Sequence, residues 1–312
     1  MPLEWPPETV LDEDMIEPWC QPVSNQVLDF HGDPLKAGLV VFSDGNHHMA
    51  LLESLKAFYR RHPRVNDIFY ATTPPHPIVR LLRTGAIRLG NLTLSIRPHV
   101  FISPPQVLET LKNEGYLNRH RLLAQNRGSV LLIPRGNPKK IVALADLMRQ
   151  DVRLFISNPD TEKTSYSGYR RTLEGMAGRQ GLDNEAFCRD VFGETAVFGR
   201  RIHHREAPEA VAYGHADAAI VYYHLALRYT RIFPNRFDII ALGGTRTDPE
   251  PPPENLTAGI HMGVIRDGGT WGERFLTFMQ SDIAARIYAR HGLRHRRDIS
   301  ETPLPRLPRN RP

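Results

Sequence analysis

The sequence predicts an α/β protein with largely parallel sheets. Short apolar runs rich in β-branched residues and phenylalanine recur after Gly38, and segments with apolar residues at helical spacing lie between several of them. Strands that alternate with helices in this way are typical of sheets whose faces are covered by helices. The chain of 312 residues is also long enough for two lobes with separate cores.

The expected elements follow the chain in order. We expect strands at the apolar runs 39–42, 67–70, 99–102, 130–133, 153–156, 218–223, 237–242 and 261–265. Stripes of apolar residues at helical spacing mark helices around 51–59, 78–82 and 275–287. The proline-rich stretch 247–255 is expected to be a loop.

The two ends of the chain differ from this regular middle. Residues 1–37 hold six prolines, two tryptophans and no sustained period, so we expect an N-terminal extension draped over the first lobe. Residues 298–312 form a basic tail rich in proline and arginine. Such a tail can touch nucleic acid or an acidic membrane surface, but its prolines favour a solvated end, and we expect no nucleic-acid partner.

Composition narrows the class of protein. A hydrophobic share of 41% and a charged share of 24% are typical of soluble globular proteins. No run of about 18 apolar residues is present, so we expect no membrane insertion. The N-terminus is acidic and lacks the apolar core of a secretory signal. We therefore expect a cytoplasmic protein, or a periplasmic one whose signal peptide has been removed.

Polar loops at the strand-to-helix junctions are the expected place for a ligand. In open α/β sheets, ligands bind beyond the carboxyl ends of the strands, where helices begin. These junctions lie at 41–48, 71–77, 164–169 and 201–208, and three of them carry histidine. Asn46 is a plausible N-cap, and Pro77 suits the first turn of its helix.

Four segments in this order resemble the molybdate-binding proteins of ABC transporters, which have the type II periplasmic-binding-protein fold. They read NRGSVLLIPRGNP at 126–138 leading to LADL at 144–147, DVRLFISNP at 151–159, GHADAAIVY at 214–222, and FLTFMQS at 275–281 with YARHGL at 288–293. The match covers roughly residues 38–295.

The resemblance implies a fold and a division into domains. It implies two Rossmann-like lobes with mixed, mostly parallel sheets, joined by two crossover strands. Lobe 1 is expected to comprise 38–128 and 224–297, and lobe 2 to comprise 129–223. The resemblance also implies a monomer that captures a small inorganic ion by hinge closure, with an ABC-transporter permease as partner.

The resemblance also implies ligand positions in the cleft. In that family an oxyanion such as molybdate or tungstate is held by hydroxyls and by backbone N–H groups, several of them at helix N-termini. The matching positions in this chain give the expected ligand-binding residues Asn46, His48, Thr73, His76, Ser167, His204 and Tyr222.

Histidine stands in several of these segments where the family uses small residues. Neutral imidazole is a common ligand for zinc, copper, nickel and cobalt. A helix N-terminus disfavours a cation by about 0.3–1 kcal/mol, whereas the free energy of zinc binding to a structural site is roughly 10 kcal/mol or more. We therefore favour a transition-metal cation held by His48, His76, His203 and His204. A molybdate- or tungstate-type oxyanion is the alternative, and histidines that line a cleft without binding anything remain a third possibility.

Other function classes are less well supported. The chain lacks HExxH, GxSxG and GxxxxGK[ST], so we expect no enzyme and no required cofactor. An intracellular ion sensor or carrier is an alternative to a transport protein, because no signal peptide is recognisable.

Overall fold

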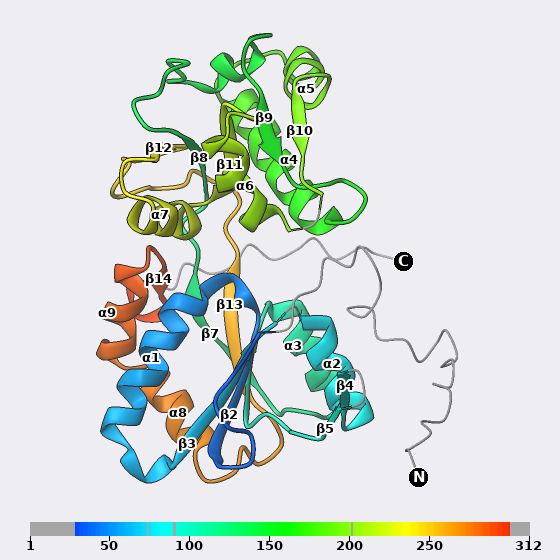
Figure 1. The fold of residues 1–312 in the computed structure, drawn as a ribbon, viewed down its shortest axis with the longest axis vertical. Coiled ribbons are helices and arrows are strands. Elements are labelled where there is room, and N and C mark those ends of the chain that lie inside the picture. Colours follow the sequence, from blue (N-terminus) through cyan, green and yellow to red (C-terminus); the bar gives the residue numbers. More distant parts are fainter. Residues whose placement is uncertain (1–28, 74, 90–91, 201, 300–312) are drawn as a thin grey trace, which may run out of the picture.

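The computed structural model describes residues 29–73, 75–89, 92–200 and 202–299. Two lobes lie one above the other, and each is a sheet covered on its faces by helices (Figure 1). The expected α/β fold of two lobes is therefore confirmed. Most of the expected N-terminal extension and most of the expected basic tail lie outside the described residues.

The sheet of lobe 1 has seven strands in the order β1-β3-β2-β6-β13-β7-β14. Their bounds are β1 Phe30–His31, β2 Ala37–Ser43, β3 Asp67–Thr72, β6 Val100–Ser103, β7 His120–Gln125, β13 Gly259–Val264 and β14 Arg294–His295, with a separate hairpin of β4 Ile87–Leu89 and β5 Leu92–Leu94. Strand β2 runs parallel to β3 and β6, whereas β13 runs antiparallel to β6 and β7. The sheet is mixed, and its parallel share is smaller than expected.

Helices cover both faces of this sheet. Their bounds are α1 His48–Arg61, α2 Pro75–Thr84, α3 Pro105–Asn113, α8 Gly272–Met279 and α9 Asp282–Arg290, with short 3-10 turns η3 Gly45–His47, η4 Pro63–Val65 and η6 Arg296–Asp298. Helices α1, α8 and α9 cover one face (Figure 1). Their residues Phe58, Phe275 and Tyr288 are buried in one cluster with residues of the sheet. Phe42, Phe101 and Leu108 pack on the opposite face, under α2 and α3. Burial of these large apolar side chains is the main stabilising contribution.

The helical stripe expected across 275–287 is two helices. Helix α8 ends at Met279, and Ser281 begins the next helix, because its side chain accepts a hydrogen bond from the backbone N–H of Ala284. A serine N-cap satisfies a backbone donor that a helix start leaves free, so it favours a new helix at this point.

The sheet of lobe 2 has five strands in the order β10-β9-β11-β8-β12. Its strands are β8 Ser129–Pro134, β9 Leu154–Ile156, β10 Ala196–Phe198, β11 Ala218–Tyr222 and β12 Phe237–Ala241, and its helices are η5 Leu144–Met148, α4 Lys163–Arg179, α5 Asn184–Phe192, α6 His203–Ala212 and α7 Tyr223–Ile232. Lobe 1 was expected to resume at residue 224, but both α7 and β12 belong to lobe 2. This strand pairs antiparallel with β8, and Phe237 and Ile239 are buried in the lobe 2 core.

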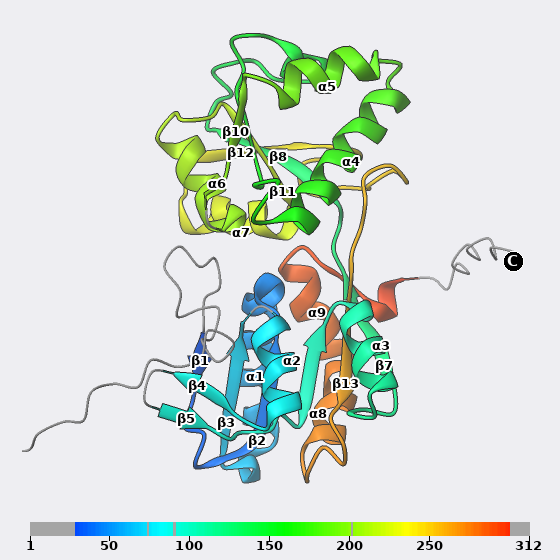
Figure 2. The ribbon, with the colours of Figure 1, turned by 90° about the vertical axis from the view of Figure 1, so that its right-hand side faces the viewer.

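Two connections run side by side between the lobes, at 126–128 and 242–258 (Figure 2). Asn255 ties them together: its side chain accepts from the backbone N–H of Ser129 at 2.7 Å and donates to the carbonyls of Ser129 and Leu242 at 2.9 and 3.1 Å. Asn126, in the first connection, also links it to the second, because its side chain accepts from the backbone N–H groups of Gly128 and Ala258. Among the described residues, no helix has both the length and the apolar character that a membrane span requires.

Candidate functional site

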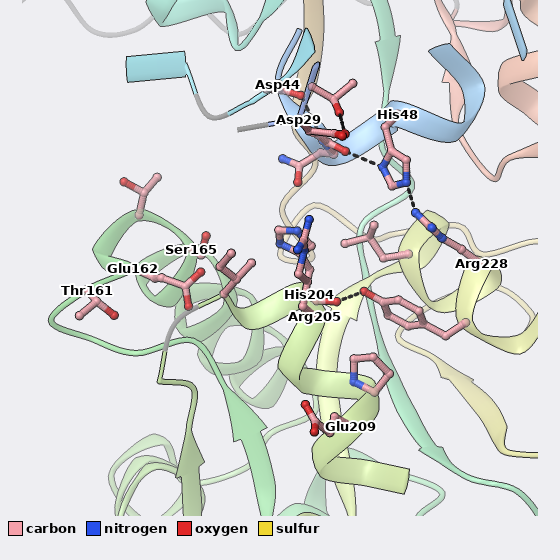
Figure 3. A pocket seen from close by; sticks show the side chains of 18 of the residues that line it. Asp29, Asp44, His48, Thr161, Glu162, Ser165, His204, Arg205, Glu209 and Arg228 are labelled. Atoms are coloured by element: carbon pink, nitrogen blue, oxygen red, sulfur yellow. Dashed lines mark hydrogen bonds between the residues drawn. The ribbon is translucent and has the colours of Figure 1, made fainter. Parts of the chain in front are cut away.

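A cavity of about 1200 Å³ lies between the two lobes (Figure 3). Residues at the beginnings of helices from both lobes line it: Asn46, His48, Pro75 and His76 from lobe 1, and Lys163, Thr164, Ser165, His204 and Arg205 from lobe 2. Helix N-termini meet here because the preceding strands end at this edge of each sheet. The cavity therefore faces the positive ends of several helix dipoles.

A buried hydrogen-bond network shapes the loop before α1. The hydroxyl of Ser43 donates to the carbonyl of Asp44 at 2.9 Å, so His47 Nε2–H donates to Ser43 Oγ at 2.9 Å. His47 Nδ1 then accepts from the hydroxyl of Tyr288 at 2.9 Å. Burial lowers the pKa of His47 to about 3, so the ring is neutral. This histidine supports the loop from behind and does not line the cavity.

Asp44 belongs to the cavity wall itself. It is 6% exposed, and its Oδ1 accepts a hydrogen bond from the backbone N–H of Asn46 at 3.3 Å. Burial raises the pKa of Asp44 to about 6. The cap explains why the 3-10 turn starts at Gly45 rather than after Asn46, the residue that the sequence suggested as N-cap.

A second carboxylate comes from the segment before β1. The hydroxyl of Thr72 and the ring of His31 donate to the carboxylate of Asp29. Although burial raises it, these hydrogen bonds hold the pKa of Asp29 below its usual value. The backbone N–H of Asp29 donates to the hydroxyl of Thr73 at 3.1 Å. The two hydroxyls of this junction therefore already bind Asp29.

The lobes touch along one side of the cavity. His48 Nδ1–H donates to the carbonyl of Gly45 at 2.8 Å, which leaves Nε2 to accept from the guanidinium of Arg228 in α7. Burial, with a smaller contribution from Arg228, lowers the pKa of His48. His224 Nε2–H donates across the same gap to the carbonyl of Asn46 at 2.9 Å. The lone pair of His48 is thus already used by an arginine.

The lobe 2 wall is built around the start of α6. The backbone N–H of His203 donates to both oxygens of Glu162, at 3.2 and 3.1 Å. The hydroxyl of Tyr229 donates to the carbonyl of His204. Burial, and then the charge of Arg205, lowers the pKa of His204 to about 4. Arg205 itself is exposed and makes no ion pair with a described residue.

The structure brings some of the expected ligand-binding residues together and separates others. Asn46, His48, His76 and His204 line the cavity, whereas Thr73 is buried behind it. Ser167 and Tyr222 line a separate hollow of about 520 Å³. The physical reason is that α4 begins at Lys163, earlier than expected, which places Ser167 on a different face of the helix from Ser165; Thr164, three residues before Ser167, lines both hollows.

The four expected metal ligands do not converge. His203 is 2% exposed, donates from Nε2 to the carbonyl of Ile220 at 2.7 Å, and stacks on Phe155. His203 and His204 are adjacent on a helix, so their side chains point about 100° apart, one into the core and one into the cavity. In the part of the chain that the structure describes, no three histidine, cysteine, aspartate or glutamate residues form a group that could hold a metal ion.

Several cavity residues escaped prediction from the sequence. Arg205 lies within the junction 201–208, directly after His203 and His204, which were the expected ligands. Arg228 lies in the middle of α7 and carries no motif. Asp29 reaches the cavity only because β1 pairs with β3, a contact between segments about 40 residues apart that leaves no local pattern.

Comparison with known proteins identifies the family. The model of the bacterial extracellular solute-binding proteins matches residues 39–294. The chain belongs to this family. This solute-binding protein is accordingly a binding protein and not an enzyme, and the resemblance to ABC-transporter binding proteins is confirmed at the level of family and fold. A comparison with curated proteins gave no match.

Solved structures share the fold of this solute-binding protein. PEB3 with bound L-phospholactate has a TM-score of 0.58 and 16% identity, over 82% of this chain and 99% of that one. The Azotobacter vinelandii periplasmic molybdate-binding protein has a TM-score of 0.52 and 17% identity, over 82% and 98%. The ferric binding protein from Campylobacter jejuni has a TM-score of 0.53 and 16% identity, over 81% and 84%. At these identities the likeness shows the fold alone.

Proposed function

We propose that this protein captures a small anion in the cavity between its lobes, closes around it by a hinge motion at the two connections, and delivers it to an ABC-transporter permease. The observation that carries the proposal is the convergence of helix N-termini from both lobes on one cavity that also holds Arg205, Arg228 and Lys163.

The physical argument is electrostatic. Each helix N-terminus presents free backbone donors and favours an anion by about 0.3–1 kcal/mol. Arginine adds charge-assisted hydrogen bonds, which are roughly twice as strong as neutral ones. An anion that contacts both lobes stabilises the closed form over the open one, because only the closed form offers both sets of donors.

A transition-metal cation, the solute favoured from sequence alone, is less well supported. His48 already uses both ring nitrogens, and His204 stands beside the positive charge of Arg205. His203 faces the core of lobe 2. A cation in this cavity would also meet the positive ends of the helices. The match to a family of extracellular proteins supports a role in transport outside the cytoplasm over that of an intracellular sensor or carrier.

Calorimetry on metal-free protein tests the proposal. We expect heat of binding with at least one of molybdate, tungstate, sulfate and phosphate, and none with zinc, copper, nickel or cobalt ions. Arg205→Gln should weaken anion binding at least tenfold, whereas Arg60→Gln, an exposed arginine near the far end of α1, should leave it unchanged. Binding of metal ions alone, or anion binding that Arg205→Gln does not alter, would contradict the proposal.

A further inference from the structure

Among the described residues that line the cavity, the lysine and arginine side chains all come from lobe 2, where they lie beside carboxylates, whereas lobe 1 contributes carboxylates alone. The lobe 2 residues are Lys163, Arg205, Arg228 and Arg236, with Asp160, Glu162 and Glu209. Asp29 and Asp44 line the cavity from lobe 1, and Arg205 stands across from them on lobe 2 (Figure 3). A site for a bare anion gains nothing from carboxylates, since like charges repel. Glu162, one of the lobe 2 carboxylates, is accounted for because both of its oxygens accept from the backbone N–H of His203 at the start of α6. Asp29 is held within lobe 1 by Thr72 and His31, whereas the carboxylate of Asp44 accepts a hydrogen bond from one described donor, the backbone N–H of Asn46.

Asp44 gives stronger evidence for a cationic ligand group than Asp29 does. Its side chain is more than nine-tenths buried and lines the cavity, and only Oδ1 binds a described donor, the backbone N–H of Asn46. Oδ2 has no partner among the residues that the structure describes. Its raised pKa, about 6, reflects this lack of compensation. A buried carboxylate without a partner is costly, and a cationic or hydrogen-bonding group of a ligand would relieve that cost.

The size and walls of the cavity agree with an organic ligand. Pockets for small organic molecules span about 300–1000 Å³, and this cavity of about 1200 Å³ leaves room beside a tetrahedral anion. Ile202, Leu225 and Tyr229 also line it, so part of the wall is apolar. An alkyl linker between two charged ends would contact these side chains.

We propose that the solute is a small organic zwitterion whose anionic end binds Arg205 and the N-terminus of α4 in lobe 2, and whose ammonium group binds Asp44 and Asp29 of lobe 1. This inference rests on the proposed capture of an anion and names its chemical class. It also explains a feature of the N-terminal segment: Asp29 precedes residues 39–294, the stretch that matches the family, yet it supplies a carboxylate to the cavity. Asp29 and Asp44 thus determine specificity.

Calorimetry with isosteric pairs tests this inference. The probes are 2-aminoethylphosphonate against propylphosphonate, and taurine against 1-propanesulfonate, in which a methyl group replaces the ammonium. We expect the ammonium-bearing member of at least one pair to bind tenfold or more tightly than its partner. Asp44→Asn retains the oxygen that accepts from Asn46 and removes the charge, so it should abolish this difference without unfolding the loop. Asp33→Asn, a change at a carboxylate outside the cavity, should preserve it.

The outcomes separate this inference from the proposed function. Tight binding of molybdate or sulfate, with no preference for an ammonium group, would overturn the inference and leave anion capture standing. A preference that survives in Asp44→Asn would also overturn it, because the ammonium would then bind elsewhere. Heat with none of the organic or inorganic anions would contradict both proposals.

Discussion

Replacing Asn255 by alanine removes the side chain that joins the two inter-lobe connections. Asn255 is 2% exposed, and its amide makes all three of its hydrogen bonds to backbone groups of Ser129 and Leu242. Alanine fits the same backbone and makes none of them. The change therefore isolates the contribution of this amide to the stability of the crossing.

The expected cost follows from these bonds. The backbone N–H of Ser129 would be left buried without an acceptor, which costs about 1–3 kcal/mol. Each of the two bonds donated to carbonyls contributes about 0.5–1.5 kcal/mol. The free energy of unfolding should therefore fall by about 2–6 kcal/mol, a large share of the roughly 5–15 kcal/mol that stabilises a typical protein.

Urea denaturation at pH 7, followed by circular dichroism, measures this loss. Asn113→Ala, at an exposed position that ends α3, is the matched control and should change stability by no more than about 0.5 kcal/mol. Asn255→Asp adds a second check, because its carboxylate still accepts from Ser129 but faces two carbonyl oxygens. If Asn255→Ala is as stable as the control, the amide does not hold the connections together, and the reasoning is refuted.

Three further predictions concern the same crossing, the buried histidines and the lobe contact. Gly128→Ala should destabilise the protein by about 2 kcal/mol more than Gly136→Ala. Both glycines have positive φ, but of the two only Gly128 is crowded, because a Cβ added there would lie 2.7 Å from Cβ of Pro251. Equal melting temperatures of the two variants would disprove this crowding. Stability should fall as the pH drops from about 6.5 to 4, because burial lowers the pKa of His47 to about 3 and the pKa values of His203 and His224 to about 4, so that only the unfolded chain takes up these protons. The raised pKa of buried Asp44 acts in the opposite direction, but Asp44 is a single group. A higher melting temperature at pH 5 than at pH 7 would contradict this prediction. A double-mutant cycle on His48→Ala and Arg228→Ala should give a coupling of about 0.5–3 kcal/mol in stability, and additive effects would show that these two residues do not interact.

Much of the fold follows from hydrophobic periodicity. The expected strands at 39–42, 130–133 and 218–223 became β2, β8 and β11, whose apolar residues are buried. Periodicity shows which residues are buried, but it does not say against which lobe they pack. This is why β12 was assigned to the wrong lobe: its apolar pattern fits either sheet, and only its pairing with β8 decides.

The candidate site was harder to predict because side-chain direction decides it. His203 and His204 are chemically alike, yet only His204 lines the cavity. A signal was present, since His203 shares helical spacing with Ala207 and Val211, both buried in lobe 2. The cavity residue Asp29 had no such signal. Its position depends on pairing between distant strands, which local sequence does not encode.

Strand β1 has a consequence for the solubility of shortened forms of this protein. Phe30 and His31 pair with Ala71 and Tyr70 and so cover the outer edge of β3. A chain trimmed to begin at residue 38 would leave the backbone N–H and C=O groups along that edge without partners, and unpaired edges of this kind pair with strands from other molecules. Trimming would thus remove a cavity carboxylate and a guard against self-association at once, so aggregation and altered ligand preference would arise together.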